Sequence, residues 1–286
     1  MKVKTAAKIN LALDVTGKLP NGYHTIESVF QTVGLYDEVS VELTPKDIVL
    51  SCEVPEEFAA SDPIPCDERN IAYKAAKLFF EENGMDCGCR IHIKKGIPSQ
   101  AGMGGGSTDA AAVLYCLGRM TGKSVKAPEK LGADVPFFLT GGTAYVEGIG
   151  ERITPIADHS GKILVIAKGK EGVSTAQAYG NIDSLSAPEH PETRKLVEAI
   201  EKAPDTAYKF FGNLFEQAVE LAEVSDIRSE MLKSRALSAV MTGSGSAVFG
   251  LFKEPAQAVR CVDKLREKGY FACVCETVPE SFIILD

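Results

Sequence analysis

The chain has 286 residues, of which 45% are hydrophobic and 24% charged, so it is long enough for two domains or one large one and has the composition of a soluble globular protein. Its formal net charge of -8 argues against a broad nucleic-acid-binding surface, and no segment reaches the ~20 apolar residues that a membrane span requires. We therefore expect a cytoplasmic protein with no nucleic-acid or membrane partner. We further expect a monomer or weak homodimer. Its eight cysteines form no Cys-x2-Cys pair, which predicts reduced thiols rather than a metal site.

The first predicted element is a strand over residues 3 to 15. Apolar side chains alternate along one face of it, at Ile9, Leu11, Leu13 and Val15. The other face carries Lys8 and Asn10, so the pattern predicts a half-buried strand with these two polar side chains on its open side. A turn at 20–22 and further strand-like segments at 28–30 and 39–41 follow.

Residues 70 to 84 predict an amphipathic helix, because apolar side chains recur at helical spacing from Ile71 to Phe79 and Gly84 ends the pattern. A short strand around residues 91–93 comes next. Apolar residues at helical spacing return between 110 and 117. The intervening segment is therefore expected to join a strand to a helix.

This segment, residues 97–112, carries four glycines, at 102 and at 104 to 106, directly before a hydroxyl pair and an alanine run. Glycine adopts backbone angles closed to other residues, and the first turn of a helix presents free N–H groups at the positive end of its dipole. The segment therefore predicts a phosphate-binding loop. Its glycines do not fit the dinucleotide pattern G-x-G-x-x-G. The P-loop pattern is also absent, because Gly122-Lys123-Ser124 has its tail but Leu117 stands where its first glycine is required.

The second half of the chain opens with a predicted strand at 163–166. After a charged, proline-containing stretch at 184–204, a strand–strand–helix–strand series runs from 237 to 278. This order predicts an α+β sandwich with helices on one face. We place the domain boundary between 150 and 162, which gives domains 1–155 and 156–286.

The segment Pro98–Thr108 resembles the P-x-x-x-G-[LM]-G-[GS]-S-[STA] loop of the GHMP small-molecule kinases, with one extra glycine. Four further motifs are similar to a single subfamily: residues 7–11, 21–24, 132–138 and 242–246. The resemblance covers residues 4 to 253 and implies an α+β, two-domain GHMP kinase fold, with an N-terminal domain like ribosomal protein S5 domain 2 and a C-terminal ferredoxin-like sandwich. The connection 118–131 is shorter than the resemblance leads us to expect.

The resemblance implies an ATP-dependent kinase of the non-mevalonate route to isoprenoids, acting on the 2-hydroxyl of a cytidine diphosphate conjugate. Asp134 is the expected base that accepts the hydroxyl proton, and Lys8 would keep Asp134 ionised. The alternatives are a helix-capping role for Asp134 and a solvent-exposed position for Lys8. Mg²⁺ is expected with ATP because it bridges phosphate oxygens in such transfers, but the sequence identifies no metal ligands.

The residues expected to bind ATP are those of the glycine loop and two that match nucleoside contacts of the family: Pro98, Ala101, Gly102, Met103, Gly104, Gly105, Gly106, Ser107, Thr108, Asn70 and Lys95. The loop would supply backbone and hydroxyl donors to the phosphates. A tight structural turn is the alternative for this segment.

The residues expected to bind the second substrate are Asn10, Tyr23, His24, Tyr179, Gly243 and Gly245. Tyr23 and His24 would read the cytosine ring, and Tyr179 is either a second stacking partner or ordinary packing. The glycines would let a second loop close on the diphosphate, or would simply form a hairpin turn.

Two other functions compete with this interpretation. A sibling kinase acting on mevalonate or homoserine would share the glycine loop and differ around residues 23–24. A nucleotide-binding regulator would retain the loop without catalysis, although it would have no use for both Lys8 and Asp134.

Overall fold

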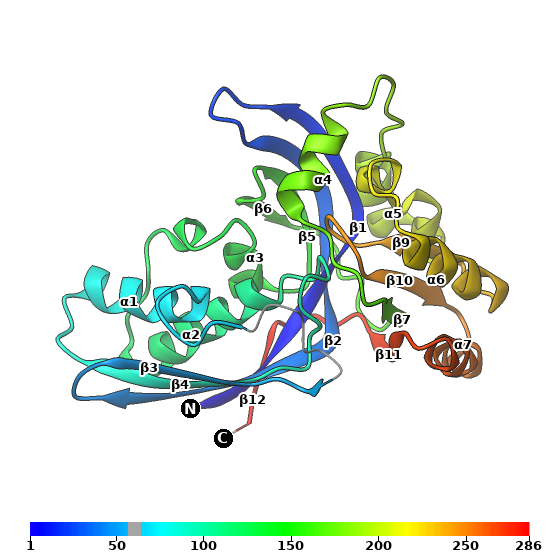
Figure 1. Ribbon diagram of the computed structural model, residues 1–286. Coiled ribbons are helices and arrows are strands. Elements are labelled where there is room, and N and C mark those ends of the chain that lie inside the picture. Colours follow the sequence, from blue (N-terminus) through cyan, green and yellow to red (C-terminus); the bar gives the residue numbers. More distant parts are fainter. Residues whose placement is uncertain (57–63, 286) are drawn as a thin grey trace.

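The computed structural model describes residues 1–56 and 64–285, which form two β-sheets with helices on their outer sides (Figure 1). The elements of the first half are β1 (Lys2–Lys18), β2 (His24–Thr44), β3 (Ile48–Glu53), α1 (Ile71–Asn83), β4 (Gly88–Lys94), α2 (Gly105–Thr121), η2 (Pro128–Lys130), α3 (Val135–Thr140), β5 (Thr143–Gly148) and β6 (Arg152–Pro155). Those of the second half are β7 (Ile163–Lys168), α4 (Thr175–Ile182), α5 (Thr193–Lys202), η3 (Pro204–Phe210), β8 (Gly212–Asn213), η4 (Leu214–Gln217), α6 (Ala222–Lys233), β9 (Ser238–Met241), β10 (Val248–Phe252), α7 (Pro255–Glu267), β11 (Phe271–Glu276) and β12 (Phe282–Ile284).

The larger sheet is built around one long strand, β2. Its strand order is β12-β1-β2-β4-β3, with β5 paired to the first half of β2 and β6 paired to β5. The segments at 28–30 and 39–41 are therefore one continuous strand rather than two. Helices α1, α2 and α3 pack on one face of this sheet, where Phe79, Leu117 and Phe137 are fully buried (Figure 1).

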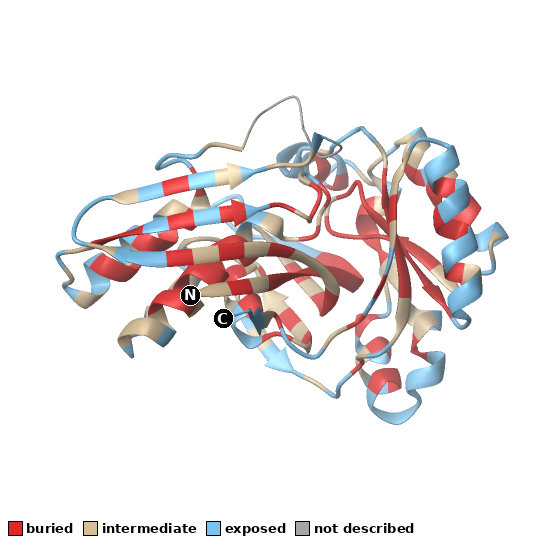
Figure 2. Ribbon diagram, turned by 90° about the horizontal axis from the view of Figure 1, so that it is seen from below, coloured by how far each residue is buried: buried red, intermediate tan, exposed pale blue. Residues whose placement is uncertain are grey.

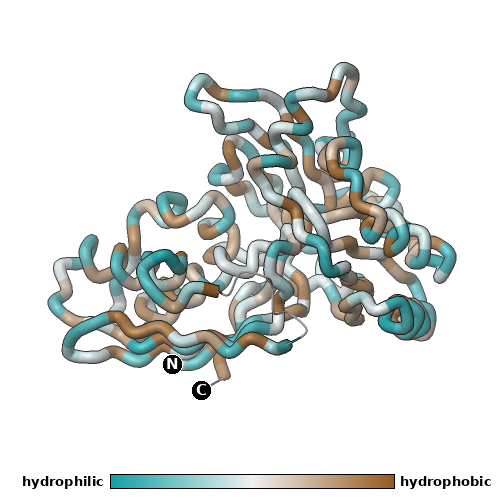
Figure 3. Tube along the Cα trace, in the orientation of Figure 1, coloured by the Kyte–Doolittle hydropathy of each residue, from teal (hydrophilic) through white to brown (hydrophobic). Residues whose placement is uncertain are grey.

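The smaller sheet has the strand order β11-β7-β10-β9, with antiparallel neighbours throughout. Its outer face is covered by α6 and α7, whose outward sides are exposed and hydrophilic (Figures 2 and 3). The strand–strand–helix–strand order of β9, β10, α7 and β11 and the ferredoxin-like sandwich are both confirmed. A boundary near residue 155 remains a proposal, because β8 and β12 belong to the larger sheet although they lie beyond it in sequence.

The expectation of a half-buried β1 is wrong, because both faces of the strand are covered. Ile9 and Leu11 pack in the core between the two sheets, with Ile166 and Phe249 opposite. A register shift between Asn10 and Ala12 inserts an extra residue, so that Leu13 and Val15 pack on the helical side instead. A prediction from strict alternation of apolar and polar residues does not include this bulge, and it therefore does not predict that Lys8 and Asn10 are buried.

The predicted helices begin and end close to where the sequence places them. Asn70 caps α1 by accepting a hydrogen bond from the Ala72 N–H, and Gly84 ends the helix with φ of 59°. The short connection after α2 contains one turn of 3-10 helix and leads directly to Asp134 at the start of α3. All eight cysteines are free, and none of the helices in the described ranges is long and apolar enough to cross a membrane.

Candidate active site

The glycine loop lies where the two sheets meet. It connects β4 to α2, and the last two glycines of the series already belong to the first turn of that helix. The backbone of Lys8 donates a hydrogen bond to the Met103 carbonyl at 3.1 Å, and that of Ala247 donates to the Ala101 carbonyl at 3.3 Å. The loop is therefore attached to β1 on one side and to the β9–β10 turn on the other.

Two glycines of the loop have conformations that other residues rarely adopt. Gly102 has φ of 70° and Gly104 has φ of 72°. A Cβ on Gly102 would overlap the carbonyl oxygen of Thr242, and one on Gly104 would lie 2.7 Å from the Phe138 ring. Close packing and backbone angle together require glycine at both positions.

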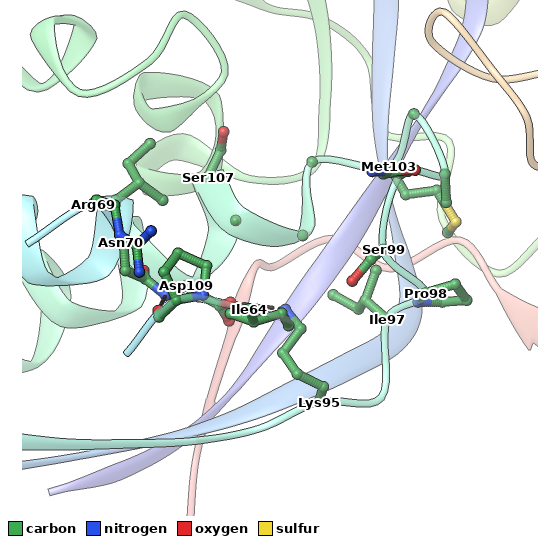
Figure 4. Close-up of a pocket in the computed structure, with 18 residues that line it drawn as sticks. Ile64, Arg69, Asn70, Lys95, Ile97, Pro98, Ser99, Met103, Ser107 and Asp109 are labelled. Atoms are coloured by element: carbon green, nitrogen blue, oxygen red, sulfur yellow. Dashed lines mark hydrogen bonds and ion pairs between the residues drawn. The ribbon is translucent and has the colours of Figure 1, made fainter. Parts of the chain in front are cut away.

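A cavity of about 470 Å³ lies on one side of the loop (Figure 4). It is lined by the loop, by the start of α1 and by the end of β4: Ile64, Pro65, Arg69, Asn70, Ile71, Lys95, residues 97–107 and Asp109. The free N–H groups of the first turn of α2 lie at this cavity, and such groups bind anions well.

A second cavity, of about 360 Å³, lies on the other side of the loop. It is lined by Lys8, Asn10, Leu13, Ile26, Phe30, Gly102, Gly104, Ser107, Ala133, Asp134, Ile149, Thr175, Tyr179, Phe215, Gly243 and Ser244. Gly102, Gly104 and Ser107 line both cavities. The loop thus separates two binding spaces and contacts both.

Lys8 and Asp134 form an ion pair in the second cavity. The Lys8 Nζ lies 3.5 Å from the Asp134 Oδ2, donates to the Asn10 Oδ1 at 2.9 Å, and lies 4.3 Å from the centre of the Phe30 ring. The Lys8 side chain is 5% exposed and that of Asp134 28%, so a ligand can reach the carboxylate while the ammonium lies behind it. A carboxylate that is paired in this way and open to the cavity can act as a proton acceptor.

Asn10 connects β1 to the β9–β10 turn. Besides Lys8, its Oδ1 accepts hydrogen bonds from the Gly243 N–H at 3.0 Å and from the Thr242 hydroxyl at 3.2 Å, while its Nδ2 donates to the Ser28 hydroxyl. Gly243 is part of the β9–β10 turn, and its backbone also packs closely against Gly102 of the glycine loop. Gly245 lines neither cavity.

The aromatic residues expected around a cytosine ring are only partly brought together. His24 stacks on Tyr179 with ring centres 4.6 Å apart and planes at 16°, and its Nε2 lies 2.7 Å from the Asp183 Oδ1. Burial and the nearby charge of Asp134 raise the pKa of Tyr179 to about 12, so its phenol stays neutral. Tyr23 is 62% exposed and lines neither cavity.

The side chains of Asn70 and Lys95 both line the first cavity, but each already has protein partners. The Asn70 Oδ1 caps α1 and its Nδ2 donates to the Pro65 carbonyl at 2.8 Å. Lys95 is paired with Asp37 and Asp109. Among the described residues, no three His, Cys, Asp or Glu side chains are gathered in a way that could hold a metal ion.

The structure corrects the expectation for Thr108. Its hydroxyl donates to the Ala6 carbonyl at 2.8 Å and its side chain is fully buried, so it ties α2 to β1 and cannot reach a phosphate. Ser107, by contrast, lines both cavities. The difference follows from helix geometry, since neighbouring residues of a helix point about 100° apart.

We therefore predict opposite effects for substitutions at these two neighbours. Thr108→Val leaves a buried carbonyl unpaired and should lower the free energy of unfolding by about 1–3 kcal/mol without changing the affinity for ATP. Ser107→Ala should weaken ATP binding without changing stability. Denaturant titration and calorimetry with ATP measure both quantities; weaker ATP binding by a stably folded Thr108→Val protein would contradict the assignment.

Sequence reasoning missed several residues of the second cavity or its rim, among them Phe30, Phe215 and Thr242. Phe30 lies opposite Asn10 in the β1–β2 pairing, and only that register places its ring beneath Lys8. Phe215 packs edge-on against Tyr179 at 4.9 Å. No local motif marks Phe30 or Phe215, because the position of each depends on contacts between distant segments. Thr242 belongs to the 242–246 motif, but the sequence assigned it no role.

Comparison with known proteins gives two family matches. Residues 70–142 match the GHMP kinases N terminal domain, and residues 207–270 match the GHMP kinases C terminal domain. The first match includes the glycine loop and Asp134. The second begins just before β8 and ends before β11.

Full-length relatives are also found. The chain is 42% identical to a 4-diphosphocytidyl-2-C-methyl-D-erythritol kinase of Clostridium botulinum (strain Eklund 17B / Type B), over 97% of this chain and 100% of the relative. A crystal structure of 4-(cytidine 5'-diphospho)-2C-methyl-D-erythritol kinase superposes with a TM-score of 0.79 at 31% identity, covering 97% of this chain and 100% of that one. A homoserine kinase from Cytophaga hutchinsonii, with a TM-score of 0.75 at 16% identity over 100% of this chain and 97% of that one, shares the fold.

Proposed function

Because this chain belongs to the GHMP kinases, and within them to the 4-diphosphocytidyl-2-C-methyl-D-erythritol kinase family, we propose that it transfers the γ-phosphoryl group of ATP to the 2-hydroxyl of 4-diphosphocytidyl-2-C-methyl-D-erythritol. The observation that best supports this reaction is the position of the Lys8–Asp134 pair. The pair lies in the second cavity, which shares Gly102, Gly104 and Ser107 with the first cavity on the other side of the glycine loop.

In the proposed reaction, ATP occupies the first cavity and the alcohol the second. Asp134 accepts the hydroxyl proton as the oxygen attacks the γ-phosphorus, a new P–O bond forms, and the bond to the β-phosphate oxygen breaks to release ADP. Lys8 stabilises the negative charge that develops on the attacking oxygen. The N–H groups of the first turn of α2 would hold the phosphates, and Mg²⁺ arriving with the nucleotide would supply charge neutralisation.

The experiment that tests this function is ADP release with Mg-ATP and a panel of alcohols. We expect turnover with 4-diphosphocytidyl-2-C-methyl-D-erythritol, and phosphorus NMR of the product should show a new phosphomonoester. Faster turnover of mevalonate or homoserine would identify a sibling kinase. ATP binding without ADP release on any acceptor would identify a regulator.

We propose that Tyr179 stacks on the cytosine ring of the substrate. His24 covers one face of Tyr179 in this structure, so a base stacked there would displace the imidazole, which would then be free to contact the edge of the base. Phe215 holds the Tyr179 ring from the side and lines the same cavity. Asn10 and Gly243 would fix the position of the cavity wall, and Tyr23 would contribute only after moving inward.

Tyr179→Ala should raise the KM for the cytidine substrate by roughly 5- to 150-fold, because loss of one stacked base costs about 1–3 kcal/mol. The KM for ATP should not change, since Tyr179 lines only the second cavity. Tyr179→Phe is the matched control and should behave like the parent protein. An unchanged KM for the cytidine substrate in Tyr179→Ala would assign Tyr179 to ordinary packing.

We also propose that the protein works in the cytoplasm, as a monomer or weak homodimer. The eight free cysteines support this location, since reduced thiols are usual in reducing compartments.

A further inference from the structure

A buried cluster of three ionisable groups lies beneath the phosphate loop. It consists of Asp37 from β2, Lys95 directly after β4 and Asp109 from α2. Lys95 donates to both carboxyl groups, at 2.7 Å to the Asp109 Oδ2, and all three side chains are at most 7% exposed. Figure 4 shows the Lys95 side chain reaching from the strand towards Asp109.

The cluster holds both ends of the phosphate loop. The Asp37 Oδ1 accepts hydrogen bonds from the backbone N–H groups of Gly96 and Ile97, at 2.7 and 2.8 Å, where the chain enters the loop. Lys95 connects this carboxylate to Asp109, where the chain has left the loop and entered α2. A Cβ on Gly105 would lie 3.5 Å from the Lys95 Nζ, so the ammonium lies directly under the first turn of the helix.

The two carboxyl groups have different surroundings. Asp37 accepts hydrogen bonds from three donors, namely two backbone N–H groups and the Lys95 ammonium. These bonds stabilise a buried carboxylate anion. The Asp109 Oδ2 has the Lys95 ammonium, but its Oδ1 is buried and has no hydrogen-bond partner among the described residues. Burying an ionised carboxylate with one oxygen that accepts no hydrogen bond costs much free energy, whereas burying a neutral carboxylic acid costs far less.

We propose that Asp37 is a positioning residue for the phosphate loop, and that Asp109 is held as a neutral carboxylic acid. The cluster then carries one ammonium and one carboxylate and is neutral overall. A second carboxylate would place a net negative charge beneath the loop that receives the triphosphate. This proposal rests on the assignment of the first cavity to ATP.

The titratable neighbours of Asp109 agree with this arrangement. Burial raises the pKa of the Asp109 carboxyl well above its ordinary value; Lys95 offsets part of this effect, and Asp37 adds to it. Burial opposes the charge on Lys95, but Asp109 and Asp37 together raise its pKa, so the lysine stays charged. On β3, Cys52 also faces this group, and burial raises the pKa of its thiol to about 12, so it remains neutral.

The test applies the same change to the two carboxyl groups. Asp109→Asn keeps the shape of a neutral acid and should bind ATP within roughly threefold of the parent protein. Asp37→Asn removes the charge that accepts from three donors and should weaken ATP binding roughly tenfold or more. Calorimetry with Mg-ATP alone measures this on the full chain without any alcohol acceptor, so the result does not depend on the identity of the second substrate.

Two further measurements keep the proposal open to refutation. If the Asp37→Asn variant is active, its KM for ATP should rise while its KM for the cytidine substrate stays the same. A general loss of folding would not change one KM and leave the other. Should Asp37→Asn fail to fold, the infrared spectrum of the parent protein minus that of Asp109→Asn decides the protonation state. It should contain the carbonyl band of a protonated carboxyl that shifts in D₂O. Carboxylate bands alone, or equal loss of ATP affinity in both variants, would overturn the proposal; absence of ATP binding in the parent protein would instead refute the assignment of the cavity.

Discussion

Asp134→Asn should lower kcat by roughly 10²- to 10⁴-fold, the usual contribution of a positioned general base. The amide keeps the size of the carboxylate but cannot accept the hydroxyl proton, and it loses the ion pair with Lys8 at 3.5 Å. The affinity for ATP should change little, because Asp134 lines only the second cavity. ADP release under saturating substrates, together with calorimetric ATP binding, measures both effects.

Asp86→Asn is the control for this experiment. It makes the same chemical change at an exposed carboxylate between α1 and β4, and should retain full activity. If Asp134→Asn turned over as fast as this control, the base would have to be another group, and the mechanism proposed above would fail.

Gly102→Ala should raise the KM for ATP by roughly tenfold or more, because misplacing binding groups by even ~1 Å is costly. Two effects combine at this position. The left-handed backbone angle costs ~1–2 kcal/mol with a Cβ present, and that Cβ overlaps the Thr242 carbonyl. The loop and the β9–β10 turn must then move apart, and this movement also breaks the contact of Gly243 with Asn10.

Gly122→Ala separates the two effects. Gly122 has φ of 71°, almost the same as Gly102, but its Cβ would meet nothing within 4 Å. The loss of stability in Gly122→Ala should therefore equal the cost of the left-handed backbone angle alone. Its KM for ATP should equal that of the parent protein. Equal KM values for both variants would show that the contact between the loop and the turn is unimportant for nucleotide binding.

The elements predicted best are those whose signals are local. The helix from Asn70 to Gly84 has a capping side chain at one end and a left-handed glycine at the other, and both signals lie within a few residues of the boundary they mark. The phosphate loop was recognisable for the same reason. Its glycines and the helix that follows are contiguous in the sequence.

The features predicted least well depend on pairing between distant strands. One extra residue in β1, at the shift between Asn10 and Ala12, moves Leu13 to the face that carries Lys8, and no rule of alternation reveals it. Burial of Lys95 between two carboxyl groups likewise needs the pairing of β2 with β4 to bring Asp37 near the loop. Identifying residue types was therefore easier than identifying their partners.

Because β12 completes the larger sheet, the active-site strand β1 is fully paired only after the end of the chain has been synthesised. Val3, Lys4 and Thr5 of β1 pair with residues 282–284 of β12. β1 is also the strand that carries Lys8, three residues after Thr5. While a ribosome is still making the second half, this edge of β1 has no partner, and open strand edges promote association between chains. Cutting the gene near codon 155 would leave the same edge open permanently, so the first half should be recovered as aggregates rather than as a nucleotide-binding fragment.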